Sequence, residues 1–193
     1  MNVKLYVRIV IIVVLTISAL PSLAQEKSKE PERLITETKT VAAKIKFSQS
    51  DMYEVRGEAT YTIETIQPDD SFTGTLVYTL TEEARRKLAK LAGKSLADIP
   101  AKFEQKEVRA DFEKKTECPS LHLEFETFEK LEKVKIKSGE IEILFGRFVL
   151  GLPETPQEVS KLVCRYVEAM NNGRVSAYRR YSRHINNLLK GEQ

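Results

Sequence analysis

The sequence predicts an α+β fold, in which one curved antiparallel β-sheet of about seven strands, connected as a meander, is packed by C-terminal helices. Two observations predict this class. Between residues 41 and 150, short segments alternate apolar and polar residues with the period of two that is typical of half-buried strands. Between residues 155 and 189, the apolar residues instead recur with helical spacing. A partly open β-barrel or calyx closed by a helix is the alternative that the same pattern allows.

The size and composition fit one folded domain over residues 34–193. The chain has 193 residues, of which 41% are hydrophobic and 31% are charged, as in ordinary globular proteins. This composition excludes a disordered chain and a collagen-like repeat. We expect residues 34–152 to be mainly β with one helix over about 82–92, and residues 155–189 to form two helices.

The first 24 residues have the pattern of a cleaved secretory signal. Lys4 and Arg8 precede an apolar or small-residue run over 9–20, which is shorter than the ~20 residues that span a bilayer. Ser22 and Ala24 then place small residues at the two positions that a signal peptidase reads. The segment resembles a bacterial signal, so the periplasm is the expected destination and the extracellular space the second choice. An uncleaved membrane anchor is the alternative.

The mature chain is expected to begin with a flexible polar leader over residues 25–33. The formal net charge of the whole chain is +3, and residues 1–24 carry two positive charges and no negative ones. A nearly neutral mature chain has no electrostatic reason to bind a polyanion. We therefore expect no nucleic-acid partner, and no stable transmembrane span after cleavage.

Three alternating segments open the predicted sheet, over residues 41–47, 53–63 and 72–80. Turn-forming residues separate them at 49–51 and 68–71. Each segment has one apolar and one polar face, which predicts an antiparallel meander with one buried side. The residues predicted to face the core are Val41, Ala43, Ile45 and Phe47 in the first segment, Tyr53, Val55, Ala59, Tyr61 and Ile63 in the second, and Phe72, Leu76, Tyr78 and Leu80 in the third.

A helix is expected next, over about residues 82–92. Thr81 can cap its N-terminus, and the two glutamates that follow suit the positive end of the helix dipole. Gly93 is the residue type that commonly ends a helix. The segment over 95–100 is expected to be a loop with one short turn.

Four further strands are predicted before the C-terminal helices, and the last of them continues past Gly146 as far as Leu150. Ser138 and Gly139 mark a tight hairpin turn between the third and the fourth of these strands. The four strands cover residues 107–112, 121–126, 134–136 and 141–150.

Residues 155–189 predict two helices. The first begins with a capping box over 155–158 and ends at Asn172 and Gly173. The second spans about residues 174–189. Their packed sides are predicted to carry Val159, Leu162, Val163, Tyr166, Val167 and Met170 in the first helix, and Val175, Tyr178, Ser182, Ile185 and Leu189 in the second.

Cys118 and Cys164 are the only cysteines, and neither belongs to a Cys-x-x-Cys pair or a metal-ligand cluster. Export to an oxidising compartment favours a disulfide between them. A redox-active or nucleophilic thiol is the alternative interpretation.

The common catalytic and metal-binding motifs are missing from the sequence. It has no Gly-rich phosphate loop, no Gly-x-Ser-x-Gly elbow, no His-Glu-x-x-His pair and no calcium loop. We therefore assign no catalytic residue, no metal ligand and no cofactor, and we lean toward a protein that is not an enzyme.

The polar faces of two predicted strands can be interpreted either as solvent-facing surfaces or as chemical sites. One could hold a metal ion, and the other could provide the acid and base of a glycosidase-like site. Since both alternate with apolar residues, we interpret both as solvent-facing sides of strands. The residues are His122, Glu124 and Glu126 for the first face, and Glu54, Glu58 and Glu64 for the second.

Tyr53, Tyr61 and Tyr78 lie on the apolar faces of adjacent predicted strands. Each hydroxyl needs a hydrogen-bond partner if it is buried. These rings are either ordinary core tyrosines or the aromatic lining of a pocket for a small hydrophobic ligand. They are the candidate ligand-binding residues.

Arg179, Arg180 and Arg183 fall away from the apolar side of the last predicted helix. From Arg165 onward the chain has six basic residues and only two acidic ones. A solvated helix face is the simpler interpretation. The functional alternative is a surface for an anionic partner, such as a phospholipid headgroup, an envelope polysaccharide or an acidic protein.

The sequence alone does not establish a function, and three hypotheses follow from it. The first is an exported non-catalytic binding or interaction protein of the bacterial cell envelope, supported by the export signal and the basic helix. The second is a carrier of a small hydrophobic ligand in a cavity between sheet and helix. The third is an exported hydrolase whose site no common motif marks.

Overall fold

The computed structural model describes residues 31–47, 52–113, 116–125, 135–153 and 158–192. The predicted signal over 1–24, most of the polar leader and the first three residues of the predicted capping box lie outside these ranges. Within them, no helix combines the length and the apolar character that crossing a membrane requires.

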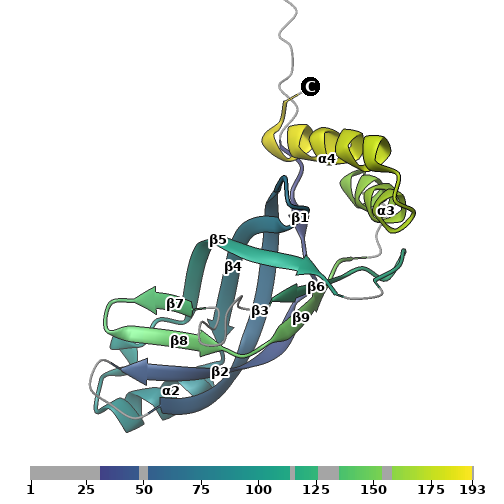
Figure 1. The fold of residues 1–193 in the computed structure, drawn as a ribbon. Coiled ribbons are helices and arrows are strands. Elements are labelled where there is room, and N and C mark those ends of the chain that lie inside the picture. Colours follow the sequence, from purple (N-terminus) through teal and green to yellow (C-terminus); the bar gives the residue numbers. More distant parts are fainter. Residues whose placement is uncertain (1–30, 48–51, 114–115, 126–134, 154–157, 193) are drawn as a thin grey trace, which may run out of the picture.

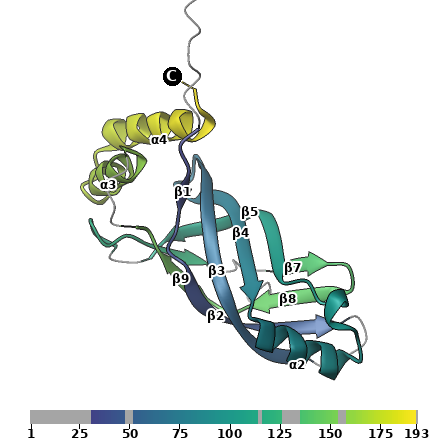
Figure 2. The ribbon, with the colours of Figure 1, turned by 180° about the vertical axis from the view of Figure 1, so that it is seen from behind.

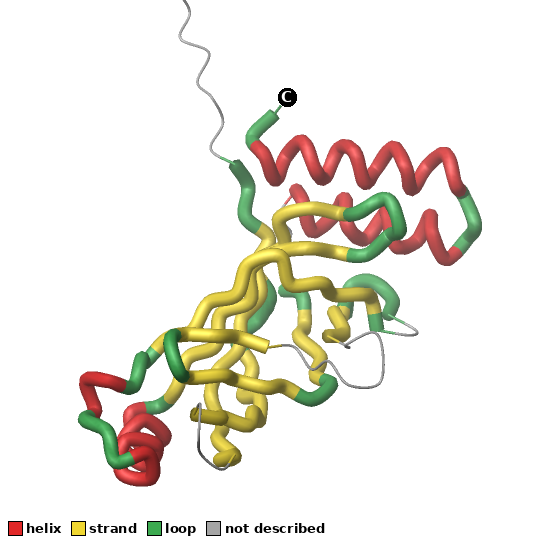
Figure 3. The backbone as a smooth tube through the Cα atoms, turned by 60° about the vertical axis from the view of Figure 1, so that its left-hand side comes forward, coloured by secondary structure: helices red, strands yellow, loops and turns green. Residues whose placement is uncertain are grey.

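The fold is α+β, as predicted, with a strongly curled antiparallel sheet packed against two C-terminal helices (Figures 1 and 3). The helices are α2 (Glu82–Ala92), α3 (Glu158–Asn171) and α4 (Val175–Lys190), with a 3-10 turn η1 (Leu96–Asp98). The strands are β1 (Leu34–Ile35), β2 (Lys39–Phe47), β3 (Met52–Ile66), β4 (Phe72–Leu80), β5 (Lys102–Phe112), β6 (His122–Phe125), β7 (Lys135–Ser138), β8 (Ile141–Phe145) and β9 (Phe148–Gly151).

The sheet runs in the order β7-β8-β2-β3-β4-β5-β6-β9, and the short β1 pairs with β3 beside this path. Every pairing is antiparallel. The long central strands alternate buried and exposed residues because one face lines the core and the other meets solvent. The inward-facing residues predicted for β2, β3 and β4 are buried, except that Tyr53 is only half-buried.

β8 and β9 form one bent strand that pairs with two different parts of the sheet. β8 pairs with β2, and β9 pairs with β6. Gly146 and Arg147 form the bend between them. At the far end of β9, the Glu37 N–H donates to the Gly151 carbonyl at 2.9 Å, which brings β9 back toward the start of β2. The predicted continuation past Gly146 is confirmed, but the continuing strand changes its partner.

Aromatic rings fill the concave side of the curled sheet. Tyr61 contacts Phe125 and Tyr78 contacts Phe145, each with ring centroids 4.9 Å apart. Phe148 lies 4.6 Å from Phe125 and 5.5 Å from Phe145, again between ring centroids. The sheet therefore closes largely on its own side chains. The predicted packing of helix against sheet occurs at one end of the sheet rather than across its middle (Figures 1 and 2).

Two side-chain contacts fix α3 and α4 on the turn between β3 and β4. The Asn186 side chain of α4 accepts from the Ile66 N–H at 2.7 Å and donates to the Ile66 carbonyl at 3.0 Å. The buried Tyr166 of α3 donates its hydroxyl proton to a carboxylate oxygen of Asp70 at 2.9 Å. Together these bonds set the orientation of the helix pair on the sheet.

We expect Asn186→Ala to lower the free energy of unfolding by about 1–3 kcal/mol, because it leaves the N–H and carbonyl of the buried Ile66 without partners. Asn187→Ala, which changes the exposed neighbour, is the matched control and should have little effect. Urea unfolding followed by circular dichroism measures both variants. Equal destabilisation of the two would contradict the docking role of Asn186.

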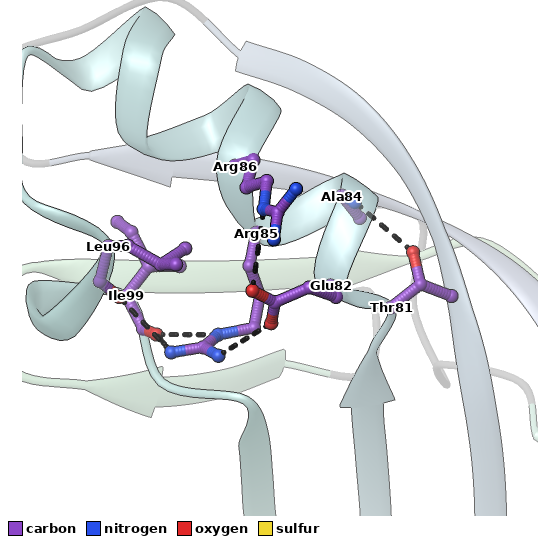
Figure 4. A network of polar contacts seen from close by, with 7 residues as sticks. All are labelled: Thr81, Glu82, Ala84, Arg85, Arg86, Leu96 and Ile99. Atoms are coloured by element: carbon purple, nitrogen blue, oxygen red, sulfur yellow. Dashed lines mark hydrogen bonds and ion pairs between the residues drawn. The ribbon is translucent and has the colours of Figure 1, made fainter.

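Local contacts account for α2 and the turn that follows it (Figure 4). The Thr81 hydroxyl accepts from the Ala84 N–H at 3.1 Å, which confirms the predicted N-cap. The Arg85 guanidinium donates to the carbonyls of Leu96 and Ile99 at 2.8–3.1 Å, and so holds η1 against the helix. The predicted short turn is this 3-10 segment.

Candidate functional site

The candidate tyrosines lie in or beside the aromatic core. Tyr61 and Tyr78 are fully buried, while Tyr53 is half-buried near the start of β3. The Tyr61 hydroxyl donates to the Val108 carbonyl at 2.7 Å, and the Tyr78 hydroxyl donates to the Val41 carbonyl at 3.1 Å. Burial raises the pKa of both buried phenols far above the ordinary tyrosine value. Both buried hydroxyls are therefore neutral and have partners within the protein.

Gly57 of β3 makes room for the Tyr78 ring. A Cβ atom at this position would lie 2.7 Å from the Tyr78 Cζ and 2.6 Å from the Thr79 carbonyl oxygen. The absence of a side chain at Gly57 is thus required for the ring to reach Val41.

The described residues form surface clefts of 230, 340, 370 and 520 Å³, and the three candidate tyrosines line none of these four. A ligand role for the tyrosines stays a prediction.

Strand β6 departs from its predicted solvent-facing polar side. Glu124 is only 7% exposed and forms an ion pair with Arg147, the residue at the β8–β9 bend. It lies opposite Asp111 in the pairing of β5 with β6. Burial raises the pKa of Asp111, while the guanidinium of Arg109, 3.6 Å away, opposes that rise. The interpretation of Glu124 as solvent-facing is therefore wrong, because the bend places a cation over it.

The other candidate metal ligands and acid–base residues do not gather into one site among the described residues. His122 is partly exposed, with its Nδ1 3.9 Å from a carboxylate oxygen of Glu113, and Glu126 lies outside the described residues. Glu54, Glu58 and Glu64 are exposed, as interpreted from their alternation with apolar residues. In the part of the chain that the structure describes, no three His, Cys, Asp or Glu residues gather into a group that could hold a metal ion.

A disulfide joins Cys118 to Cys164, as predicted, with their Cα atoms 5.6 Å apart. Cys118 lies in the turn that precedes β6, and Cys164 lies in the middle of α3. The bond therefore ties α3 covalently to the turn that precedes β6, and neither cysteine is a free thiol.

The candidate arginines lie on the outer side of α4. Arg179, Arg180 and Arg183 are all exposed, as is Lys190 in the last turn. Because each residue of an α-helix advances by ~100°, these four fall within about a third of the circumference of α4. We call this side the basic face. The opposite side of α4 is anchored by the buried Ile185.

The basic face lies on a helix that contains no acidic residue. No acidic residue occurs between Val175 and Lys190, and no carboxylate of the described residues forms an ion pair with the three arginines. Arg183 donates to the Arg179 carbonyl at 3.3 Å, and the Arg180 guanidinium lies 5.3 Å from the centroid of the Tyr181 ring. These contacts hold the side chains on the helix surface, and neither contact involves a carboxylate.

The helix pair concentrates the positive charge of the chain. Residues 158–192 contain seven basic and three acidic residues, whereas the whole chain has a net charge of only +3. The residues outside both 1–24 and 158–192 therefore carry a net negative charge. The pair also lies at one end of the molecule, where α4 packs against α3 and the end of β3 (Figures 1 and 2).

The sequence predicts where the arginines lie on the helix, but not the contacts that hold α4 on the sheet. The helical period alone separates Arg179, Arg180 and Arg183 from the apolar side. In contrast, Asn186 is an ordinary polar residue in that pattern, and its partner Ile66 is 120 positions away. No local signal could have joined the two.

No family model, no curated protein and no solved structure matches this chain.

Proposed function

We propose that this protein is an exported, non-catalytic interaction protein of the bacterial cell envelope that attaches to a membrane surface carrying anionic phospholipids. The observation that carries the proposal is the basic face of α4, whose arginines are exposed and form no ion pair with another described residue.

The shape of the basic face favours an extended partner over a small ligand. The face is the convex side of one helix, and α4 lines none of the four clefts described above. From Arg179 to Lys190 the helix rises by about 16 Å, so several headgroups can be contacted at once. The helix pair lies at one end of the molecule (Figure 1), and the residues of the basic face are exposed there, so that α4 can meet a flat surface.

The chemistry of the face favours phosphate. Three of its four cations are arginines, whose planar guanidinium matches phosphate oxygens in a bidentate geometry. Val175, at the first turn of α4, adds an aliphatic side chain that is 48% exposed and can enter the headgroup region. Each basic residue near an anionic membrane surface contributes about 1 kcal/mol of attraction.

Two observations support export. The Cys118–Cys164 disulfide is of the kind that persists in oxidising compartments. The predicted signal over residues 1–24 would direct the chain across a bacterial inner membrane, and we propose the periplasm as its destination.

The proposal predicts that the triple variant Arg179→Gln, Arg180→Gln and Arg183→Gln binds anionic vesicles on the order of 100-fold more weakly than the parent protein, because three contributions of about 1 kcal/mol are lost. Co-sedimentation with phosphatidylcholine vesicles, with and without phosphatidylglycerol, measures this. The parent protein should bind only the vesicles with phosphatidylglycerol, and added salt should weaken that binding.

The matched control removes the same charge from another exposed helix surface, by Arg86→Gln, Lys87→Gln and Lys90→Gln in α2. This control should bind within a few-fold of the parent. An intact mass establishes that all three proteins have the same N-terminus, so that residues 1–24 do not account for any difference. Equal weakening in both variants, or no binding of the parent to either vesicle, overturns the proposal.

A further inference from the structure

A cleft of about 370 Å³ lies beside α3, apart from the basic face. Its volume is at the lower end of the ~300–1,000 Å³ range of small-molecule sites. Four buried aliphatic side chains contribute to its wall, each at most 5% exposed: Leu34, Leu121, Leu152 and Val163. The disulfide at Cys164 also borders the cleft and fixes α3 beside it.

The α3 side of the cleft is polar and carries two cations. Lys161 and Arg165, one helical turn apart, are both exposed, and neither forms an ion pair with another described residue. Glu168 is the acidic residue on the same wall. Ser160, next to Lys161, has a buried hydroxyl without a hydrogen-bond partner in the described part of the chain. A hydrogen-bonding group is thus left unused beside the two cations.

We infer that this cleft binds one single-chain amphipathic carboxylate of the fatty-acid type. The alkyl chain lies against the aliphatic wall, because transfer of its methylene groups from water is favourable by about 0.8 kcal/mol each. The carboxylate lies between Lys161 and Arg165, where charge-assisted hydrogen bonds are available. This inference goes beyond the proposed membrane attachment and does not depend on it.

The residues around the cleft discriminate between ligands of equal chain length. A neutral head group leaves the two cations without a partner, and a cationic head group is repelled by them. The expected order of affinity is therefore dodecanoate, then dodecanol, then dodecyltrimethylammonium. Isothermal titration calorimetry measures this order on the purified protein, below the micelle concentration of the two ionic ligands and below the solubility limit of dodecanol. Near-UV circular dichroism establishes that the fold is retained.

The double variant Lys161→Gln and Arg165→Gln should bind dodecanoate about tenfold more weakly, with dodecanol changed by no more than about twofold. The variant Ser160→Leu adds volume to the wall of the cleft and should weaken both ligands. The triple variant of the basic face, Arg179→Gln, Arg180→Gln and Arg183→Gln, should bind dodecanoate as the parent does. The same triple variant tests vesicle binding, so failure of one idea is distinguishable from failure of the other.

Saturable binding of one dodecanoate per chain, reduced by the loss of Lys161 and Arg165, is the supporting result. Binding at many sites, equal affinity for the three head groups, or unchanged dodecanoate affinity in the double variant overturns the inference. Lys161 and Arg165 are exposed, so we expect their replacement to leave the fold intact. The double variant therefore tests the inference even if the added volume of Ser160→Leu disturbs packing.

Discussion

Replacement of both Cys118 and Cys164 by alanine should lower the free energy of unfolding by about 4 kcal/mol. The disulfide closes a loop with a sequence separation of 46 residues, so its loss frees a large number of conformations in the unfolded chain. Urea unfolding of the oxidised parent protein and of the double variant, under non-reducing conditions, measures the difference.

The parent protein treated with a reductant is the control for this prediction. It should unfold at nearly the same urea concentration as the double-alanine variant, since both lack the cross-link. A midpoint for the variant equal to that of the oxidised parent would contradict the prediction. A variant that is unstable while the reduced parent is not would instead trace the effect to side-chain packing around Cys164.

Phe145→Ala should destabilise the protein by about 3–5 kcal/mol. The fully buried ring of Phe145 contacts Tyr78 on one side and Phe148 on the other, with centroids 4.9 Å and 5.5 Å away. Its removal opens a cavity at the point where the curled sheet closes on itself. Chemical unfolding monitored by far-UV circular dichroism measures the loss.

Leu144→Ala is the matched control for Phe145→Ala. Leu144 is the adjacent residue in β8, but it points to the other side of the strand and is only partly buried. We expect it to cost about 1 kcal/mol or less. Similar effects at the two positions would mean that the aromatic core does not determine the stability of the sheet.

The parts of the fold that could be predicted are those with a local period. In β2, Val41, Ala43, Ile45 and Phe47 share one side while Lys44 and Lys46 lie on the other, and this alternation is enough to assign the buried side. The same holds for the helical period in α3, where Val159, Leu162, Val163, Tyr166, Val167 and Met170 are buried or partly buried.

The parts that could not be predicted depend on residues far apart in the chain. β9 reads as a simple continuation of β8, and only the three-dimensional curl of the sheet brings it to β6. Glu124 has the sequence signature of a solvent-facing residue, but Arg147 covers it after the bend. Val175 fits the apolar side of α4 by its spacing, yet it is 48% exposed because the packed surface does not extend to the first turn of the helix.

Of the two candidate sites, only the one with a local sequence period could be predicted. The exposure of Arg179, Arg180 and Arg183 follows from the helical period and could be predicted from the sequence. The cleft beside α3 could not, because its wall combines Leu34, Leu121 and the disulfide with a helix that begins more than thirty residues after β6. Its residues lack a shared motif and become neighbours only in the folded chain.

The bent strand β8–β9 has a consequence for the order in which the molecule can assemble. The segment Ile141 to Gly151 supplies both the partner of β2 and the partner of β6. Until this segment has emerged from the ribosome, both strands present unpaired backbone groups that can template aggregation. Completion of the sheet also requires contacts between distant parts of the chain, which are slow to form. A nascent chain that ends before Ile141 is therefore prone to aggregate. The single segment from Ile141 to Gly151 then pairs with the free sides of both β2 and β6.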